Sequence, residues 1–431
     1  MRHILTMTAT GSAGLVAIFM VDVINLLYIA QLNDQTLTAA VGYGATIMFF
    51  SISLSVGLSI ATTALAARAI GSGDLKRARS VAASSLFFTA LVNVVLAIVI
   101  YFLLEDFLRL LGATGRTYDE ALGFIQIVVL SSPLMGVAMS LSGLLRAKGD
   151  AKRAMYVTLS GGVAAAIFDP ILIFGFDLGI TGAAYATFLS RVVLISVGIY
   201  GAQIVHNLVG RINREALSRH GRAFVIIAAP AILTQLATPV GNAYVTSAIS
   251  EFGDDAIAGW TIIGRVMMVA FGTLFALSGS VGPIISQNLG AKLFTRIDQT
   301  LRDALVFTLL YTLVVWALLA LFRNQIISMF GATGDAASMV SFFCLFVAAS
   351  YLFNGALFVA NAAFNNLDHP LLATVFNWGR STIGVIPFVY VGKSFGAIGV
   401  LAGWGLGAVV FGIGAAIMSF RVVTRLPEKF P

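Results

Sequence analysis

The tetrapeptide Gly112-Ala113-Thr114-Gly115 occurs a second time as Gly331-Ala332-Thr333-Gly334, and this pair of identical stretches decides the fold of the chain. Each copy separates two apolar runs at the same point of its half of the sequence. Further pairs keep nearly the same spacing: Gly71 with Gly290, Asn33-Asp34 with Gly253-Asp254, Gly44 with Gly264, and Gly175, Gly179 and Gly182 with Gly392, Gly396 and Gly399. The repeat predicts two similar halves.

The composition places the chain in a membrane. Hydrophobic residues make up 59% of the 431 residues and charged residues only 10%, and the mean hydropathy is +0.95. Soluble proteins average about 25% charged residues. Four His and one Cys offer little material for a metal cluster, a thiol nucleophile or a disulfide framework. We therefore expect no cofactor and no structural metal, and we expect Cys344 to serve packing.

Twelve apolar runs are long enough to cross roughly 30 Å of hydrocarbon. They are Ala9–Leu32, Leu37–Ala67, Val81–Leu104, Ala121–Leu145, Ala154–Phe174 and Ile180–Val205 in the first half, and Ala223–Ser250, Ile257–Ile285, Ala304–Phe322, Ala336–Asn361, Leu371–Val391 and Ala397–Phe420 in the second. Six runs per half is an even number, so both halves enter the membrane in the same sense. The predicted fold class is an all-α integral membrane protein with twelve transmembrane helices in two pseudo-symmetric six-helix lobes.

The loops predict the boundaries and the orientation. We predict an N-terminal lobe over residues 1–205, a cytoplasmic inter-lobe linker over 206–222, and a C-terminal lobe with a short cytoplasmic tail over 223–431. Of the 26 Lys and Arg residues, 19 fall in loops on the side of the N-terminus, four on the other side and three inside spans. Cytoplasmic loops carry such an excess, so both termini are predicted to be cytoplasmic. The net charge of +7 then reflects loops beside an anionic leaflet, and no nucleic-acid partner is expected.

Several segments, in this order on twelve spans, resemble the multidrug and toxic compound extrusion (MATE) transporters over essentially the whole chain. They are Val21-Asp22, Leu65–Asp74, Arg146–Asp150, Phe168-Asp169-Pro170, and Phe174-Gly175 with Gly179–Ala184. The resemblance implies a multi-pass, monomeric antiporter of a bacterial cytoplasmic membrane. It implies export of bulky, usually cationic amphiphiles in exchange for protons or sodium ions, through lobes that open alternately to each side.

Asp22 and Asp169 are lone carboxylates inside apolar runs. An intramembrane acid is costly and marks a functional site by default. Asp22 lies 13 residues into its run and Asp169 15 into its own, so at about 1.5 Å per residue both lie roughly 20 Å from the cytoplasmic end. Two neighbouring carboxylates in a poorly hydrated pocket would load and release a proton near neutral pH. The alternative is that both acids hold helices together or satisfy backbone groups.

The surroundings of Asp169 favour protons over sodium as the coupling ion. Pro170 removes a backbone donor and predicts a kink or local unwinding beside Asp169. The resemblance assigns Thr187 to a hydroxyl position of the family's ion site, although a threonine that bonds to its own helix is an equal alternative. Family members often carry Asn four residues before this Asp, where this chain has Ala165, so a sodium ion at Asp22 and Asp169 would lack a neutral oxygen ligand.

The second lobe has no predicted buried acid. Some family members carry acids where this chain has Thr238 and Asn354, and Asn242 stands at the repeat position of Asp22. Together with Gln235 and Arg265, these residues are predicted to line the substrate cleft, although polar contacts between packed helices are the common alternative. Arg265 and Arg380 would attract an anionic group, or else extend to the interface and bind backbone carbonyls. Arg191 is predicted to be structural.

An enzyme is not predicted. Every His lies in a tail or a loop, and no glycine-rich phosphate-binding loop with its Lys is present, so nucleotide hydrolysis is not the energy source. The partners expected are a small amphiphilic substrate, a proton or sodium ion, and membrane lipid. Two alternatives to drug export are a flippase or exporter of a lipid-linked precursor or metabolite from the same superfamily, which Arg265 and Arg380 favour, and a passive channel.

Overall fold

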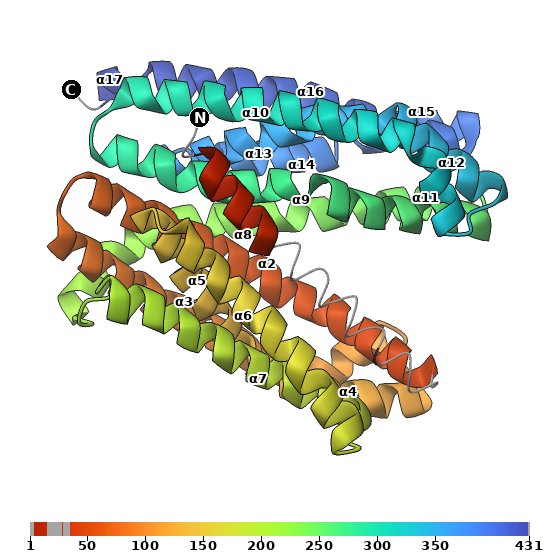
Figure 1. Ribbon diagram of the computed structural model, residues 1–431, viewed down its shortest axis with the longest axis horizontal. Helices are drawn as coiled ribbons and strands as arrows, with labels where there is room; N and C mark the ends of the chain where they lie inside the picture. The colour runs from red at the N-terminus through yellow and green to blue at the C-terminus, as the bar shows by residue number, and fades with distance from the viewer. Residues whose placement is uncertain (1–3, 15–27, 29–34, 430–431) are drawn as a thin grey trace. The chain divides into compact units, whose positions relative to one another are not determined.

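The structure is a computed structural model that describes residues 4–14, 28 and 35–429. These residues form helices and connecting turns, without any strand. The chain divides into two compact units (Figure 1). We call Ala13–Ile232 the N-terminal unit, and Leu233–Pro431 together with Met1–Ser12 the C-terminal unit. The boundary between them falls inside one helix, α8 (Arg214–Ser250). The predicted limits at 205, 206–222 and 223 stay predictions.

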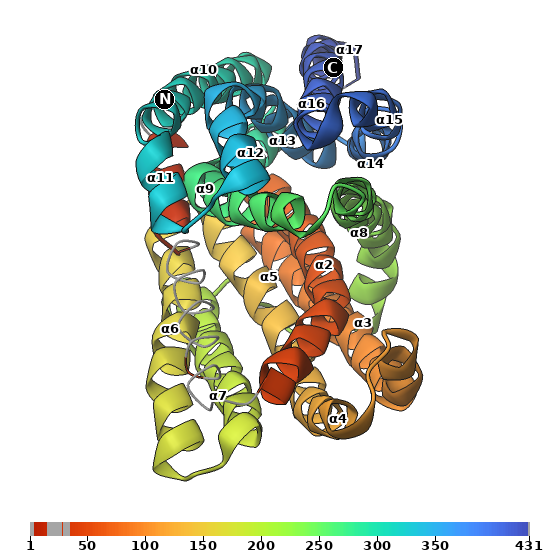
Figure 2. The ribbon, with the colours of Figure 1, turned by 90° about the vertical axis from the view of Figure 1, so that its right-hand side faces the viewer.

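The described helices of the N-terminal unit follow the predicted order of spans. They are α2 (Gln35–Gly71), α3 (Leu75–Leu110), α4 (Gly115–Leu130), α5 (Ser132–Lys148), α6 (Ala151–Pro170) with a π-helical turn η1 (Ile171–Gly175), and α7 (Gly179–Ile199) with a π-helical turn η2 (Tyr200–Val205). α2 packs along α3 and α5, and α6 lies beside α7 (Figure 2). Most of the first predicted span, including Asp22, lies outside the described residues.

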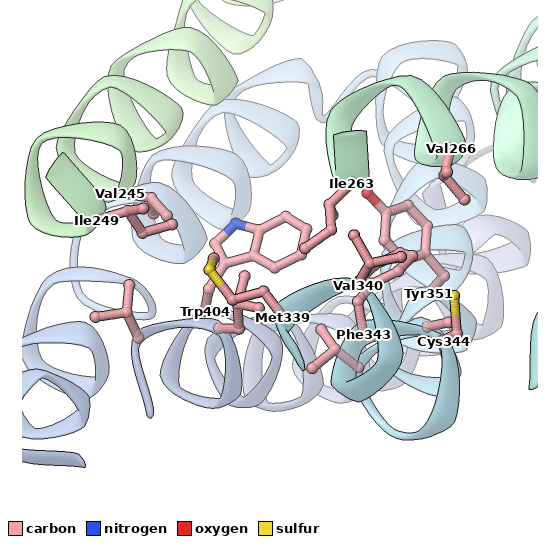
Figure 3. Packing of buried hydrophobic residues seen from close by; sticks show 14 of the residues in the cluster. Val245, Ile249, Ile263, Val266, Met339, Val340, Phe343, Cys344, Tyr351 and Trp404 are labelled. Atoms are coloured by element: carbon pink, nitrogen blue, oxygen red, sulfur yellow. The ribbon is translucent and has the colours of Figure 1, made fainter. Parts of the chain in front are cut away.

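The C-terminal unit contains α8 from Leu233 onward and the remaining helices. They are α9 (Asp254–Gly290), α10 (Phe294–Leu321), α11 (Arg323–Met329), α12 (Gly334–Leu345), the 3-10 turn η3 (Val347–Ser350), α13 (Tyr351–Asn366), α14 (Pro370–Ser381), α15 (Ile386–Gly392), the 3-10 turn η4 (Lys393–Phe395), α16 (Gly396–Thr424) and α17 (Leu426–Lys429). Tyr351 and Trp404 lie in its apolar core, where Cys344 also packs, as predicted (Figure 3). The ring of Tyr351 stacks on Phe271 at 4.0 Å between centroids.

The helices are long and apolar enough for a protein that crosses a membrane many times. Within the described residues, nine stretches pass this test, and a tenth does when α4 and α5 count as one bent span. The last stretch, Pro370–Glu428, contains two predicted spans, because α14 and α15 precede Gly396 and α16 follows it. Most observed helices are longer than the predicted runs at one or both ends, because polar turns extend the helix past its apolar core.

The repeated tetrapeptide has the same backbone in both units. The φ angles are +84° at Gly112 and +61° at Gly331, and +56° at Gly115 and +54° at Gly334. Only glycine adopts such left-handed conformations without strain. Thr114 and Thr333 between them are both extended and precede the first residue of a helix. The sequence repeat is therefore a repeat of local structure.

The fourth span bends where the sequence analysis expected one continuous helix. α4 and α5 meet at Ser131 with an angle of 42° between them, and Pro133 lies in the first turn of α5. Arg191 of α7 donates hydrogen bonds to the carbonyl oxygen of Val128 (3.0 Å) and to Oγ of Ser131 (2.8 Å). This arginine satisfies backbone and side-chain acceptors at the bend, so the structure gives it the structural role that was predicted.

The fifth span of each half is interrupted at a proline. α6 ends at Pro170 and continues as the π-helical turn η1, which confirms the predicted local unwinding. Pro387 follows Pro170 at the same separation as Gly392 follows Gly175, and it lies in the first turn of α15, after the break between α14 and α15. Interrupted helices at corresponding positions of two repeats are the usual place of a transporter's binding site.

A stripe of glycines on α16 holds the second part of the eleventh span, from Gly384 through α15, against the twelfth span. A Cβ atom added to Gly407 of α16 would lie 1.6 Å from the carbonyl oxygen of Gly384, and one added to Gly403 would lie 2.3 Å from that of Phe388. Gly399, one turn earlier, meets the backbone of Gly392 in the same way. Small residues four apart let helix backbones approach this closely in membranes.

Candidate functional site

Two charged side chains are buried in the described part of the chain, and they have opposite signs. Asp169 is 0% exposed and lies in the N-terminal unit, and Arg380 is 6% exposed and lies in the C-terminal unit. An unpaired charge at the centre of a membrane helix costs at least roughly 2.5 to 3.5 kcal/mol. Each of these side chains is therefore a candidate for function within its own unit.

Asp169 lies at the end of α6, directly before the proline that changes the helix geometry. Among the described residues, neither carboxylate oxygen has a hydrogen-bond partner. The side chain therefore does not satisfy a freed backbone group there, which was the structural alternative. The predicted pairing of Asp169 with Asp22 stays a prediction, because Asp22 lies outside the described residues.

The hydroxyl group of Thr187 has a partner on its own helix. It donates to the carbonyl oxygen of Ala183 at 3.0 Å, and the residue is half-buried on α7. This bond matches the local alternative considered for Thr187, and its part in ion coupling stays a prediction. Ala165, one turn before Asp169 on α6, is also buried and offers no oxygen ligand.

Arg380 faces α8 near the end of α14. Its Nη2 atom donates to Oγ1 of Thr238 at 2.9 Å, while its Nε atom is buried without a partner. Two more contacts hold the same helices together: Nε1 of Trp378 donates to the carbonyl oxygen of Leu233 at 3.0 Å, and the hydroxyl oxygens of Thr234 and Thr374 are 3.1 Å apart. The structure thus brings together Thr238 and Arg380, which the sequence analysis named separately.

The other predicted cleft residues differ in exposure. Gln235 and Asn242 are half-buried on α8, Asn354 is buried on α13, and Arg265 is exposed on α9. Arg265 and Arg380 are therefore not equivalent, although each is a cation in an apolar run. The cleft lined by these residues stays a prediction.

Buried polar groups that the sequence analysis missed lie on α13 and α14. The hydroxyl group of Ser381 and the Oδ1 atoms of Asn361 and Asn365 are buried without hydrogen-bond partners. Asn354, Asn361 and Asn365 are spaced so that they lie on one face of α13. This helical spacing of amides inside an apolar run was the sequence signal for them. Ser381 offers no such signal, because serine is common in membrane helices.

A polar cluster fixes the start of the fifth span, where α6 begins. Asp150 caps α6 by accepting from the backbone N–H of Arg153 at 3.0 Å, and its other oxygen lies 2.7 Å from Nε2 of His206. Burial raises the pKa of Asp150, but the hydrogen bonds from the Arg153 backbone, His206 and the Arg153 side chain, with the charge of Arg153, hold it below its usual value. Asp74 caps α3 in the same way through Arg77. The aspartates that end two of the family-like segments are thus helix caps.

Comparisons with known proteins agree with these features. The MatE family model matches residues 12–171 and again residues 230–391, one match for each half. A protein named FAD transporter, from Shewanella oneidensis, is 27% identical over 98% of this chain and 94% of its own length. The multidrug export protein MepA of Staphylococcus haemolyticus is 23% identical over 89% of this chain and 85% of its own.

Solved structures show the same fold. A crystal structure of a variant of the Vibrio cholerae MATE transporter VcmN superposes with a TM-score of 0.93 at 26% identity, over 98% of this chain and 97% of that one. The fold is an all-α membrane fold with twelve transmembrane helices in two pseudo-symmetric six-helix lobes. Since both halves match the family model, the chain belongs to the MatE family, the multidrug and toxic compound extrusion transporters.

Proposed function

We propose that the protein is a secondary active antiporter that exports cationic or otherwise amphiphilic compounds in exchange for protons. Asp169 and Asp22 are the coupling residues, with Thr187 beside them, and both chain termini lie in the cytoplasm of a bacterial cell. The observation that carries the proposal is the complete burial of Asp169 without a hydrogen-bond partner among the described residues. Multidrug export by the relative MepA supports the substrate class.

The lack of partners favours a proton over a sodium ion at Asp169. A carboxylate in a low-dielectric site is costly when ionised, and a proton removes its charge without any further ligand. A sodium ion would need several oxygen ligands. Near Asp169, Ala165 has no oxygen, and the Thr187 hydroxyl is bonded to its own helix. Release of the proton beside the π-helical turn η1 would change the local helix geometry as the lobes alternate.

The test is transport by purified protein in liposomes under an imposed proton gradient or an imposed sodium gradient. Asp169→Asn keeps the shape of the side chain and removes the titratable group, so we expect loss of uphill accumulation of a cationic dye, by about a hundredfold if the proton step is essential. Asp22→Asn should behave alike. Asp177→Asn is the matched control, because Asp177 is exposed at the end of the same span. Uphill transport by Asp169→Asn at the wild-type rate would refute the proposal, and dye equilibration without accumulation would indicate a channel.

A second candidate function is export of an anionic metabolite, and Arg380 favours it. A buried guanidinium group would repel a cationic drug and attract a phosphate or carboxylate group. The relative from Shewanella oneidensis is named a FAD transporter, and FAD carries a diphosphate. Transport of a flavin nucleotide and of a cationic dye in the same liposomes separates the two candidates. The lipid-linked precursor alternative requires the same positive charge and would appear as movement of labelled lipid.

A further inference from the structure

We propose that Arg380, Ser381 and Thr238 form an anion-recognition site within the C-terminal unit, which selects substrates that carry a phosphate group on an apolar body. The inference deepens the second candidate function and rests on the proposed export activity. It assigns Arg380, the second buried charge among the described residues, to the substrate, whereas Asp169 serves the driving ion.

The geometry brings three polar groups to one face of α8. Arg380 bonds to Thr238, and a Cβ atom added to Gly241 would lie 3.0 Å from Cβ of Ser381. Thr238 and Gly241 are three residues apart, so both lie on the same side of α8. Gly241 has no side chain, which lets the backbone of α8 approach Ser381 this closely. Arg380 and Ser381 therefore both turn toward this short stretch of α8.

The unsatisfied atoms at this place are donors. The Nε atom of Arg380 and the hydroxyl group of Ser381 are buried without partners. The hydroxyl of Thr238 accepts from Arg380, and its own proton is available to a third group. A phosphate group offers several acceptor oxygens, and charge-assisted bonds from a guanidinium group to such oxygens are among the strongest hydrogen bonds in proteins. A bound anion would accept hydrogen bonds from the Nε atom of Arg380 and the hydroxyl group of Ser381, which have no partner in the protein.

No carboxylate neutralises Arg380 in the described part of the C-terminal unit. Its acids with a described burial are exposed or half-buried: Glu251, Asp255, Asp298, Asp303, Asp335, Asp368 and Glu428. The hydrogen bond of Arg380 goes to the neutral hydroxyl group of Thr238 on α8, which does not neutralise the guanidinium charge. The charge therefore remains open to a ligand.

The position within the fold supports access by a substrate. Arg380 lies directly before the interruption of the eleventh span at Thr382–Val385, in the same span of its half as Asp169 in the fifth. Thr238, its partner, is exposed at the surface of the chain. The buried guanidinium group thus ends at a surface hydroxyl, and an anion could reach the remaining donors from that side.

The experiment compares flavin mononucleotide with riboflavin, which share one fluorescent ring and differ by a phosphate, and adds a cationic dye. Uptake into proteoliposomes with an acidic lumen is measured for wild type, Arg380→Gln, Arg380→Lys and Ser381→Ala. Loss of one charge-assisted contact should lower uptake of flavin mononucleotide about tenfold or more in Arg380→Gln. Riboflavin and dye uptake should change less than about twofold. Arg380→Lys should retain part of the activity, and Ser381→Ala should show a smaller, phosphate-specific loss.

Arg296→Gln is the matched control, because Arg296 is an exposed arginine on α10 of the same unit and has no assigned part in binding. Equal losses for all three probes in Arg380→Gln, or no loss for flavin mononucleotide, would overturn the inference. If wild type carries the dye but not flavin mononucleotide, the inference fails and proton-driven export stands. If wild type carries none of the probes against a gradient, the proposed function itself fails.

A binding measurement tests the site without relying on transport. It also shows whether the bound anion is a soluble phosphate or a lipid headgroup. We expect pyrophosphate and flavin mononucleotide, but not riboflavin, to raise the melting temperature of the wild-type protein in neutral-lipid nanodiscs. Thr238→Val should weaken that shift. A shift produced only by phosphatidylglycerol, and abolished in Arg380→Lys and Arg380→Gln, would assign the site to a lipid headgroup and overturn the substrate role.

Discussion

Arg191 shows what a membrane helix gains from one well-placed guanidinium group. It supplies a donor to the carbonyl oxygen of Val128 and to Ser131 at the bend of the fourth span. A buried acceptor that loses a charged donor costs roughly 1 to 3 kcal/mol. We therefore expect Arg191→Met to lower the free energy of unfolding by that amount, which is measured as a lower melting temperature in detergent. Arg265→Met, at an exposed arginine, should leave it unchanged, and equal losses in both variants would contradict this role.

Asp150 contributes stability that is lost when the protein is brought to acid pH. Its pKa lies below the usual value in the folded protein, so its contribution is complete above the unfolded value of about 3.9 and is lost as the pH falls through the folded value. We expect Asp150→Asn, which keeps a capping oxygen, to be less stable than wild type by about 1 kcal/mol at pH 5 to 8. The difference should shrink below about pH 4. Thermal unfolding as a function of pH measures it.

Asp74→Asn is the matched control for this pH dependence. Asp74 caps α3 as Asp150 caps α6, and no ion pair of its carboxylate is seen in the described residues. The variant should keep the capping bond and lose little stability at any pH. A difference between Asp150→Asn and wild type that persisted undiminished at pH 3 would show that the charge of Asp150 is not its cause.

At the residue scale, the sequence identified Asp169 because a single acid inside an apolar run is conspicuous. It could not separate Arg265 from Arg380, since both are cations in apolar runs and exposure depends on the face that each helix turns inward. Ser381 and the amides of Asn361 and Asn365 became visible only through their missing partners. Burial and partners are properties of packing, which a single sequence does not contain.

Among the elements, α16 packs very closely against the stretch that runs from Gly384 into α15. A methyl group on Gly407 would have to occupy the place of the Gly384 carbonyl oxygen. We expect Gly407→Ala to destabilise the protein by about 1 to 3 kcal/mol or to prevent its folding. Gly279→Ala on α9 is the control, because a Cβ there meets nothing within 4 Å and alanine favours a helix. Melting temperatures in detergent decide, and tolerance of Gly407→Ala would contradict the close contact.

Hydropathy could not predict where a helix breaks inside a membrane span. The apolar runs are continuous through Ser131, through Phe346 between α12 and η3, and through Thr382–Val385, yet the helices end there. Hydropathy reports whether a segment suits the hydrocarbon core and is indifferent to its hydrogen-bond register. The unwinding after Pro170 could be predicted, because a proline removes a backbone donor and disturbs its helix wherever it occurs.

For the whole molecule, the charge distribution predicts which loops face the cytoplasm. The chain has a single cysteine, Cys344, which is buried, so introduced cysteines report exposure without background. We expect Ser72→Cys, between α2 and α3, to react with an impermeant maleimide only after cells are opened. Asn324→Cys, at an exposed position between the ninth and tenth spans, should react in intact cells. The reverse pattern would invert the predicted orientation.

The twofold internal repeat is why the architecture could be predicted at this scale. Identical Gly112–Gly115 and Gly331–Gly334 turns, with six apolar runs in each half, fix the number and sense of the helices. The place of the two proposed coupling acids within their lobe could be predicted only as a depth along each helix, because neighbours across a bundle depend on helix rotation.

The glycine stripe of α16 has a mechanical consequence. It binds the backbone of α15 so closely that the two helices must turn as a single lever, while Arg380, Trp378 and Thr374 fasten α14 to α8. The four residues Thr382–Val385 join these two attachments, and Gly384 among them lies directly against Gly407 of α16. The eleventh span is therefore fastened on both sides of its break, and Arg380 lies at the edge of that break.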